Sequence, residues 1–314
     1  MKAFVFPGQG SQVVGMGKDL AENFPVAQEV FNEVNDALRQ NLSALMWDGP
    51  EGELTLTENA QPALMAVSVA VTRVLADRGY HLQDHASFVA GHSLGEYSAL
   101  AASGAIALDD TAKLLKLRGQ AMQRAVPIGV GAMAAIMGLD FETCTMIAEE
   151  ASQGEEICQA ANDNAPGQVV LSGTISAIGR AIDLAKERGA KRAIELPVSA
   201  PFHCALMQPA ADEMEAALAS THISAPCVPL VANVSADLVT DPDAIRALLV
   251  QQVTGRVRWR ESMRVLADKG VTQLFELGAG KVLTGLAKRN DDRLQGLSLS
   301  SAESVLSFLA ENNN

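Results

Sequence analysis

The stretch SFVAGHSLGEYSALAA, residues 87–102, joins a short apolar run, a glycine-flanked turn and an apolar, alanine-rich segment. The run at 87–90 predicts a buried strand, and the segment that includes 97–102 predicts a helix. Between them, Gly91-His92-Ser93-Leu94-Gly95 fits the pattern G-x-S-x-G of a nucleophile elbow. Such a tight turn needs glycine at both flanks, because a Cβ there would collide with the neighbouring strand and helix. We therefore predict an α/β protein in which the Ser93 hydroxyl stands clear of the backbone at a helix N-terminus.

Outward from this turn, strands and helices alternate along the chain in two different patterns. Residues 128–196 follow the order strand, helix, strand, strand, helix, strand, which is the ferredoxin-like split pattern, with a polar loop at 162–167. Residues 1–127 and 197–314 share a different pattern, in which longer helices separate the strands. We predict one large domain from these two segments and a small domain inserted into it. The expected strands are 3–6, 87–90, 132–137, 157–161, 168–171, 192–196 and 273–277, and the expected helices are 20–38, 60–77, 97–102, 109–123, 141–151, 176–188, 206–219, 244–252 and 259–269.

Composition limits the class of protein. Of 314 residues, 48% are hydrophobic and 19% are charged, which supplies apolar surface for a core and too little charge for a disordered chain. The net charge of −13 argues against a nucleic-acid binder, which needs a cationic face. No apolar stretch is long enough to span a membrane and no signal peptide is present, so we expect a cytoplasmic protein. The scattered cysteines fit neither a disulfide framework nor a zinc site, and no metal is expected. These cysteines are Cys144, Cys158, Cys204 and Cys227.

A serine nucleophile needs a general base, and the chain has five histidines. His92 is adjacent to Ser93, but neighbouring side chains on a sharp turn diverge, so we expect His92 to line the pocket. His203 lies in a loop that contains Pro197 and Pro201 and is placed between a strand and a helix. Because prolines restrict the directions of loop side chains, His203 is the favoured base. The remaining histidines, assigned to solvated or capping positions, are His81, His85 and His222.

Two backbone amides and one arginine complete the candidate site. The N–H of Leu94, at the start of the helix after Ser93, is a natural oxyanion donor. The loop of residues 8–12, GQGSQ, lacks the pattern of a phosphate-binding loop, and its slender backbone lets the Gln9 N–H approach a ligand closely. Arg118 lies in an apolar helical stretch, where it either extends to solvent or faces a buried anion. If it faces Ser93, its guanidinium selects acyl groups with a terminal carboxylate. A plain turn and a surface arginine remain the alternatives.

Six motifs in a fixed order carry a resemblance to a known family. From residue 3 to about residue 300, the sequence resembles the malonyl-CoA:acyl carrier protein transacylases of fatty acid synthesis. Each motif alone gives modest support, whereas the ordered set is highly specific. The resemblance implies an α/β-hydrolase-like large domain with an inserted ferredoxin-like small domain. The motifs are FPGQGSQ at 6–12, GHSLGEYSAL at 91–100, KLRGQ at 116–120, NAPGQVVLSG at 164–173, PVSAPFHCALM at 197–207 and GAGKVLTGLAKR at 278–289.

The same resemblance implies roles for individual residues. Ser93 and His203 form a dyad in which the serine is acylated and the histidine acts first as base and then as acid. A backbone carbonyl oxygen near Gln252, rather than an aspartate, orients the histidine. Gln9 lies in the active site, and Arg118 binds the substrate carboxylate. The residues expected to contact substrate are Arg118, Gln9, His92, Phe202, Asn162 and Gln252.

The implied reaction moves a malonyl group from malonyl-CoA to the phosphopantetheine thiol of holo-acyl carrier protein through a malonyl-serine. No permanently bound cofactor is expected, and a monomer is expected. Because the enzyme and its carrier are both acidic, docking needs a local positive field. Two basic groups are candidates for that field, namely Lys191 with Arg192 and Lys288 with Arg289.

Three other functions share parts of this pattern. A serine esterase or thioesterase also has G-x-S-x-G, but no Asp or Glu between Ser93 and His203 stands out as an orienting group. An acyltransferase of the same fold could serve a polyketide or malonate-decarboxylase pathway. A carrier-binding module without activity is disfavoured because Ser93, His203 and Arg118 are all present.

Overall fold

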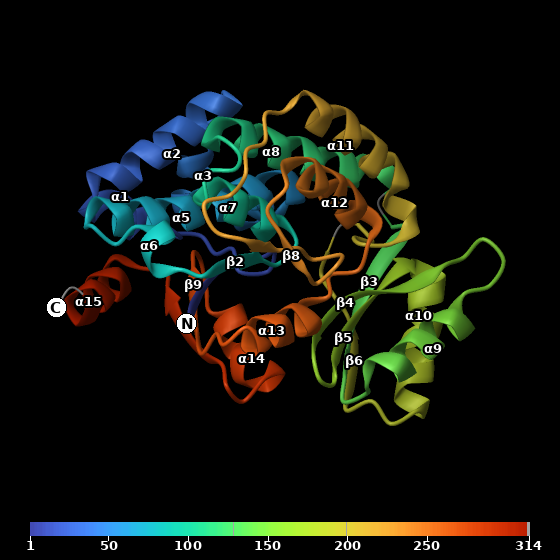
Figure 1. The fold of residues 1–314 in the computed structure, drawn as a ribbon. Coiled ribbons are helices and arrows are strands. Elements are labelled where there is room, and N and C mark those ends of the chain that lie inside the picture. Colours follow the sequence, from blue (N-terminus) through green and yellow to red (C-terminus); the bar gives the residue numbers. More distant parts are fainter. Residues whose placement is uncertain (128, 199, 313–314) are drawn as a thin grey trace.

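Two β-sheets with helices packed around them make up the computed structural model (Figure 1). The structure describes residues 1–127, 129–198 and 200–312. Ile128, where the predicted small domain begins, and Ser199, in the predicted His203 loop, lie outside the described residues, as do Asn313 and Asn314. Among the residues that the structure describes, no helix is both long enough and apolar enough to cross a membrane.

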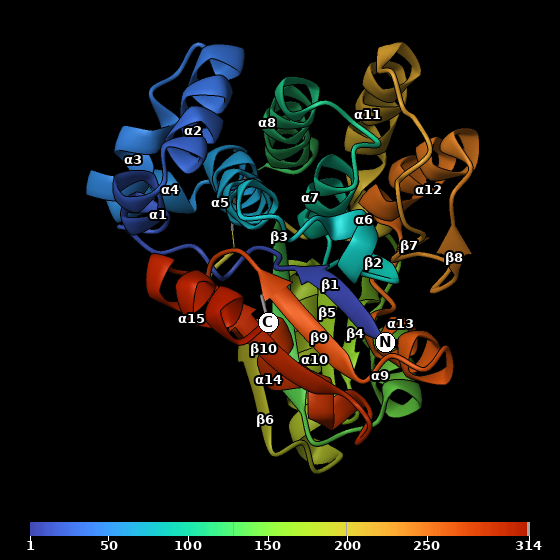
Figure 2. The same cartoon turned by 60° about the vertical axis from the view of Figure 1, so that its left-hand side comes forward.

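The larger sheet has the strand order β10-β9-β1-β2-β7-β8. All of its neighbouring strands pair in parallel except β7 and β8, which are antiparallel. Figure 2 shows β10, β9, β1 and β2 side by side, with helices above and below them. The strands are β1 (Lys2–Phe6), β2 (Phe88–Gly91), β7 (Leu230–Val231), β8 (Leu238–Val239), β9 (Gln273–Leu277) and β10 (Gln295–Leu299).

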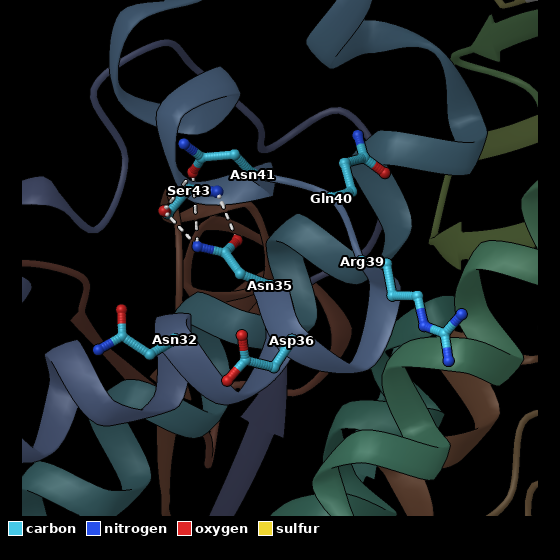
Figure 3. Close-up of a pocket in the computed structure, with 7 residues that line it drawn as sticks. All are labelled: Asn32, Asn35, Asp36, Arg39, Gln40, Asn41 and Ser43. Carbon is cyan, nitrogen blue, oxygen red and sulfur yellow. Dashed lines mark hydrogen bonds between the residues drawn. The ribbon is translucent and has the colours of Figure 1, made fainter.

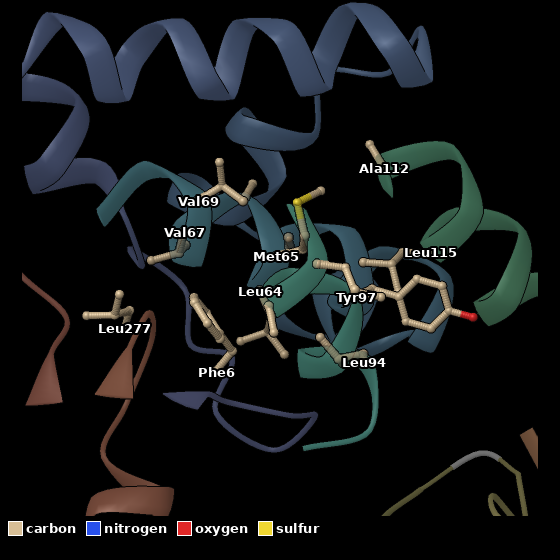
Figure 4. Close-up of a cluster of buried hydrophobic side chains, with 14 of the residues drawn as sticks. Phe6, Leu64, Met65, Val67, Val69, Leu94, Tyr97, Ala112, Leu115 and Leu277 are labelled. Carbon is tan, nitrogen blue, oxygen red and sulfur yellow. The ribbon is translucent and has the colours of Figure 1, made fainter. Parts of the chain in front are cut away.

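Helices bury both faces of this sheet, as expected for parallel strands. Side chains of β1 alternate between the faces: Phe4 and Phe6 join one hydrophobic cluster, and Ala3 and Val5 join another. The first cluster includes side chains of α2, α5, α7, α8 and α11, and the second is covered by α13 and α14. Figure 4 shows Phe6 beside Leu64 in the first cluster. These helices are α2 (Pro25–Leu38), α5 (Thr57–Asp77), α7 (Leu94–Ala102), α8 (Leu108–Ala125), α11 (Gln208–Ser220), α13 (Trp259–Asp268) and α14 (Val282–Asn290).

The smaller sheet is antiparallel, with the order β4-β5-β3-β6. Along the chain its elements run β3, α9, β4, β5, α10, β6, as the sequence predicts. One face has its own hydrophobic core against α9 and α10, whereas Met133, Ala161 and Val170 on the other face join the first cluster of the large sheet. The elements are β3 (Gly131–Met137), α9 (Phe141–Ala151), β4 (Cys158–Ala165), β5 (Gln168–Thr174), α10 (Ile175–Glu187) and β6 (Arg192–Glu195).

Several predicted elements differ from the structure. The helix predicted at 20–38 is two helices, because Phe24 is extended and Pro25 begins a new helix. The polar loop predicted at 162–167 is mostly strand, since β4 continues to Ala165 and only Pro166 and Gly167 turn. Several short or peripheral elements were not predicted from the sequence. They are α3 (Leu42–Asp48), α4 (Glu51–Thr55), α6 (Leu82–His85), β7, β8, β10 and α15 (Ala302–Asn312), while α1 (Lys18–Asn23), the 3-10 helix η1 (Ala205–Met207) and α12 (Pro242–Thr254) shift predicted boundaries.

The elbow glycines allow a test of the packing that positions Ser93. A Cβ on Gly95 would lie 2.2 Å from the carbonyl oxygen of Phe6, so Gly95→Ala forces β1 and α7 apart. We expect a loss of stability of about 3 kcal/mol or more, measured as a lower thermal midpoint. The control is Gly285→Ala in α14, where a Cβ would meet nothing within 4 Å, and helix propensity predicts a gain of up to about 1 kcal/mol. Equal midpoints for the two variants would contradict the steric account.

Candidate active site

A strained turn between β2 and α7 presents Ser93. Its backbone has φ 54° and ψ −113°, which an L-residue rarely adopts. A Cβ on Gly91 would lie 1.9 Å from the carbonyl carbon of Gly95, so both flanking glycines are required by the turn. The Asn233 side chain holds the turn from below: its Oδ1 accepts from the Ser93 N–H at 2.7 Å, and its Nδ2 donates to the Gly91 carbonyl oxygen at 2.6 Å.

The imidazole of His203 reaches the serine from the loop before η1. Its Nε2 lies 2.7 Å from the Ser93 Oγ. Its Nδ1 lies 2.9 Å from the carbonyl oxygen of Gln252 and 3.1 Å from that of Gly255. Because carbonyl oxygens only accept, Nδ1 carries the proton and Nε2 is free to accept the proton of the hydroxyl. The orienting groups are therefore backbone carbonyls, at the residue that the family resemblance indicated.

The electrostatic surroundings keep His203 neutral. Burial, and after it the positive charge of Arg118, lower the pKa of His203 to about 3, although its hydrogen bonds to Gln252 and Gly255 act in the opposite direction. A neutral imidazole is the form that accepts a proton. The site therefore holds a base in its working state throughout the neutral range.

Arg118 is almost fully buried, on α8, and points at the same hydroxyl. Its Nη2 donates to the Ser93 Oγ at 3.3 Å and to the Gln252 Oε1 at 2.9 Å, and its Nη1 donates to the Gln61 Oε1 at 2.8 Å. Its Nε is buried and has no hydrogen-bond partner among the described residues. Burial lowers the pKa of Arg118, but a guanidinium stays protonated in proteins. The site thus contains a buried cation whose direct partners are neutral oxygens.

Gln9 is connected to the arginine through two polar side chains. The Thr57 hydroxyl donates to the Gln9 Oε1 at 3.0 Å, and Gln61 Nε2 donates to the Thr57 Oγ1 at 2.9 Å. Gln61 then accepts from Arg118. Thr57 and Gln61 were not predicted from the sequence, although polar residues in the first turns of the mostly apolar helix α5 are a signal that could have found them. Leu94 begins α7, so its N–H has no acceptor within the helix.

A buried carboxyl lies beneath the elbow and was also missed. Glu96 Oε2 accepts from Gln252 Nε2 at 2.8 Å and from the Asn233 N–H at 3.1 Å. Burial raises the pKa of Glu96 to about 7, while its two hydrogen bonds and the charge of Arg118 oppose that shift. Glu96 is part of the motif at 91–100, but sequence alone gives no sign of its distant partners.

The other predicted contact residues lie around this centre. His92 is half-buried at the elbow, and its Nε2 lies 2.8 Å from the Asn164 Oδ1. Phe202 is buried beside His203 in the first hydrophobic cluster. Asn162 is buried in β4 and forms a β-bridge with Val257, two residues after the carbonyl of Gly255. The structure thus places these residues beside the Ser93 turn, the His203 loop or the segment whose carbonyls orient His203.

Both predicted basic groups lie at one end of the smaller sheet. Arg192 pairs with Met137, which pairs on its other side with Gln168. Arg289, from α14, donates through Nη1 to the Gln168 Oε1 at 2.7 Å. Lys191 precedes Arg192 and Lys288 precedes Arg289, and all four are exposed. We name these four residues, with the turn at 165–168, the hairpin face.

Comparison with known proteins identifies the family of this chain. The sequence matches the acyl transferase domain family over residues 3–292. The chain belongs to the acyl transferase family. A malonyl CoA-acyl carrier protein transacylase of Bacillus subtilis is 46% identical over 303 residues, which are 96% of this chain and 94% of that protein. The crystal structure of an acyl-carrier-protein-S-malonyltransferase of Bartonella henselae is 54% identical, has a TM-score of 0.97, and is matched over 100% of this chain and 99% of that one.

A third relative was solved as a complex. It is a malonyl-transacylase bound to a holo type II polyketide acyl-carrier protein, described as PlMCAT:AntF. It is 46% identical to this chain, with a TM-score of 0.95 over 99% of each chain. The mixed α/β fold with two sheets is therefore that of acyl transferases.

A separate polar hollow of about 520 Å³ lies between α2 and α3 (Figure 3). Asn35 Nδ2 donates to the Ser43 Oγ at 2.8 Å, and Asn35 Oδ1 accepts from the Ser43 N–H at 3.0 Å. Because these groups satisfy one another, the hollow is explained as a helix corner. Its lining residues are Asn32, Asn35, Asp36, Arg39, Gln40, Asn41 and Ser43.

The lowered pKa of His203 is directly measurable. In ¹⁵N-histidine-labelled protein we expect the His203 ring nitrogens to keep the shifts of a neutral imidazole from pH 8 down to pH 5, because burial and Arg118 disfavour the charged form. Assignment rests on the resonance that disappears in His203→Gln. A titration of that resonance near the ordinary histidine value, about 6.5, would mean that Arg118 and burial do not act as described.

Proposed function

We propose that this protein transfers a malonyl group from malonyl-CoA to the phosphopantetheine thiol of holo-acyl carrier protein, in fatty acid biosynthesis, by a ping-pong mechanism through malonyl-Ser93. The observation that carries the proposal is the convergence on one oxygen: Ser93 Oγ lies 2.7 Å from His203 Nε2 and 3.3 Å from Arg118 Nη2. A base at the hydroxyl serves acyl transfer in general. A buried cation beside it serves an acyl group that carries its own carboxylate.

In the first half-reaction, His203 Nε2 takes the proton of the Ser93 hydroxyl while Oγ attacks the thioester carbonyl carbon. The N–H groups of Gln9 and Leu94 donate to the oxyanion that forms, and the loss of one such donor commonly costs about 10²–10³ in rate. The carbon–sulfur bond then breaks, and the proton held by His203 goes to the departing CoA sulfur. The second half-reaction is the reverse, with the carrier thiol giving its proton to His203 and attacking malonyl-Ser93.

Arg118 supplies the preference for malonyl over acetyl groups in this proposal. Its direct hydrogen-bond partners, on Gln61, Gln252 and Ser93, are neutral, so its charge is not cancelled by a contacting carboxylate. Its buried Nε adds a donor with no partner among the described residues. A carboxylate in reach of this guanidinium gains a charge-assisted pair that an acetyl group cannot form. We assign His92, Phe202, Asn162 and Gln252 to the walls around the acyl chain.

The domain division belongs to the same proposal. We assign residues 1–127 and 197–314 to an α/β-hydrolase-like catalytic domain and residues 128–196 to a ferredoxin-like small domain. The separate hydrophobic core between the smaller sheet and its helices supports this division. We further propose a cytoplasmic monomer that holds no permanent cofactor or metal and binds neither nucleic acid nor membrane.

The carrier is proposed to dock on the hairpin face. Lys191, Arg192, Lys288 and Arg289 concentrate positive charge there on a chain whose net charge is −13. The same hairpin carries Asn164, whose side chain contacts His92 next to the nucleophile. A carrier at this face would thus be close to the site that its phosphopantetheine must enter.

Two other functions remain as alternatives. An acyltransferase of the same fold that serves a polyketide carrier is supported by the 46% identity to the malonyl-transacylase solved with a polyketide carrier protein. The malonate-decarboxylase variant has no such support. A serine thioesterase or esterase shares the Ser93–His203 pair but makes no use of a buried Arg118.

Malonyl loading of Ser93 tests the proposed function. After mixing with malonyl-CoA we expect intact-mass analysis to show the addition of one malonyl group, because malonyl-Ser93 persists until a carrier thiol attacks it. Ser93→Ala should show none. Release of free malonate as fast as CoA, without a stable adduct, would favour the thioesterase. Offering fatty-acid and polyketide carriers to the loaded enzyme then separates the two acyltransferase roles.

Charge reversal tests the docking face. Lys191→Glu with Arg192→Glu should raise the KM for the carrier severalfold, because it removes the positive field, and should leave malonyl loading of Ser93 unchanged. The matched control reverses Lys18 and Lys113, on α1 and α8, which changes the net charge equally. The same rise in KM in both variants would show a dependence on overall charge rather than on this face.

A further inference from the structure

Gln252 is the point at which the parts of the site are joined. Its side-chain Oε1 accepts from Arg118 at 2.9 Å, and its backbone oxygen accepts from His203 at 2.9 Å. Its Nε2 donates to the carbonyl oxygen of Ser93 at 3.0 Å and to Glu96 Oε2 at 2.8 Å. One fully buried residue therefore contacts the nucleophile's backbone, the base and the cation.

The orientation of this amide is decided by Glu96. Glu96 Oε2 accepts from the Asn233 N–H, so this oxygen is an acceptor and selects the Nε2 end of the Gln252 side chain. Oε1 must then face Arg118, which can only donate. With the amide reversed, Oε1 would face two acceptors, on Glu96 and Ser93, and Nε2 would face the donors of the guanidinium.

The same carboxylate oxygen also holds the elbow. Glu96 Oε2 accepts from the Asn233 N–H at 3.1 Å, and the side chain of Asn233 spans the turn from the Ser93 N–H to the Gly91 carbonyl oxygen. Two residues that are far from Glu96 in sequence, Asn233 and Gln252, thus donate to the same oxygen of Glu96 beneath the nucleophile.

Burial of the Glu96 carboxyl costs desolvation free energy, which indicates that this carboxyl has a specific role in the site. Glu96 is buried, and burial raises its pKa to about 7. The charged and titratable groups near it are Arg118 on α8, Tyr97 on its own helix, and His203, which it reaches only through Gln252. An apolar side chain could fill this space without the free-energy cost of burying an ionisable group.

We propose that Glu96 is a positioning residue for malonyl transfer, which fixes Gln252 and Asn233 and thereby aligns Arg118, His203 and the Ser93 turn. The inference rests on the proposed function, since the alignment of Arg118 matters only for a substrate with a carboxylate. Glu96 thus acts on the active site through Gln252 and Asn233, without contacting His203 itself.

The test compares malonyl-CoA with acetyl-CoA in single-turnover loading of Ser93. Glu96→Ala should lower the malonyl rate about ten- to hundredfold, the scale of one lost hydrogen bond to a charged group. It should also lower the malonyl-to-acetyl ratio toward that of Arg118→Ala, because Gln252 no longer holds the guanidinium. Glu96→Gln keeps an accepting oxygen of the same reach, and should restore the ratio and most of the rate.

The control is Glu276, an equally buried glutamate that accepts from the N–H groups of Leu283 and Thr284 at the start of α14. Glu276→Ala should lower the thermal midpoint and leave the ratio at the wild-type value. A soluble Glu96→Ala with the wild-type ratio, however slow, overturns the inference. If Glu96→Ala is insoluble, Glu96→Asp, which withdraws the oxygen by one carbon, should lower the ratio, and a wild-type ratio there overturns the inference equally.

The two proposals fail in different ways. Wild-type protein that takes no malonyl group from malonyl-CoA refutes the proposed function. Wild-type protein that loads normally, together with a Glu96 variant of wild-type ratio, refutes only the positioning role.

Discussion

The backbone of Gly95 lies against the carbonyl oxygen of Phe6, and the geometry of the site depends on this contact. A Cβ at Gly95 would lie 2.2 Å from that oxygen, so only glycine lets α7 start against the end of β1. The contact brings the loop that carries Gln9 and the turn that carries Ser93 to the same edge of the parallel sheet. Ligand sites of such sheets lie at that edge, where loops follow the carboxyl ends of the strands. The strained backbone of Ser93 is the local consequence.

Local sequence signals predicted the elbow and the smaller sheet because short-range patterns determine both. Two glycines four residues apart define the turn, and the alternation of strands and helices over residues 131–195 needs no knowledge of distant partners. The polar segment at 162–167 was misread because polarity indicates exposure only when side chains lack partners inside the protein. Asp163 is buried and forms an ion pair with Arg260 at 2.8 Å, and Asn164 contacts His92.

The residues that sequence reasoning missed share a different property. Glu96, Gln61 and Asn233 act on the site through partners between 57 and 156 positions away in the chain. No period or spacing encodes such a pairing. Gln252 could be named only because of the family resemblance, whereas the loop with Pro197 and Pro201 already favoured His203 as the base. The structure adds the pairing of neutral side chains with charged ones: the oxygens of Gln61 and Gln252 face Arg118, and Nε2 of Gln252 faces Glu96.

Neutral partners around Arg118 have a consequence for the base. Burial, and then the charge of Arg118, hold the pKa of His203 low, so in the free enzyme the imidazole is a weak acceptor of the serine proton. A carboxylate bound to Arg118 would offset that charge and raise the proton affinity of His203 while the substrate is in place. An acetyl group, with no carboxylate, would leave the base weak. If Arg118 were already neutralised by an acidic side chain, this difference would vanish. On the proposed function, the glutamine oxygens that contact Arg118 in place of carboxylates would therefore couple recognition of the acyl group to activation of the nucleophile.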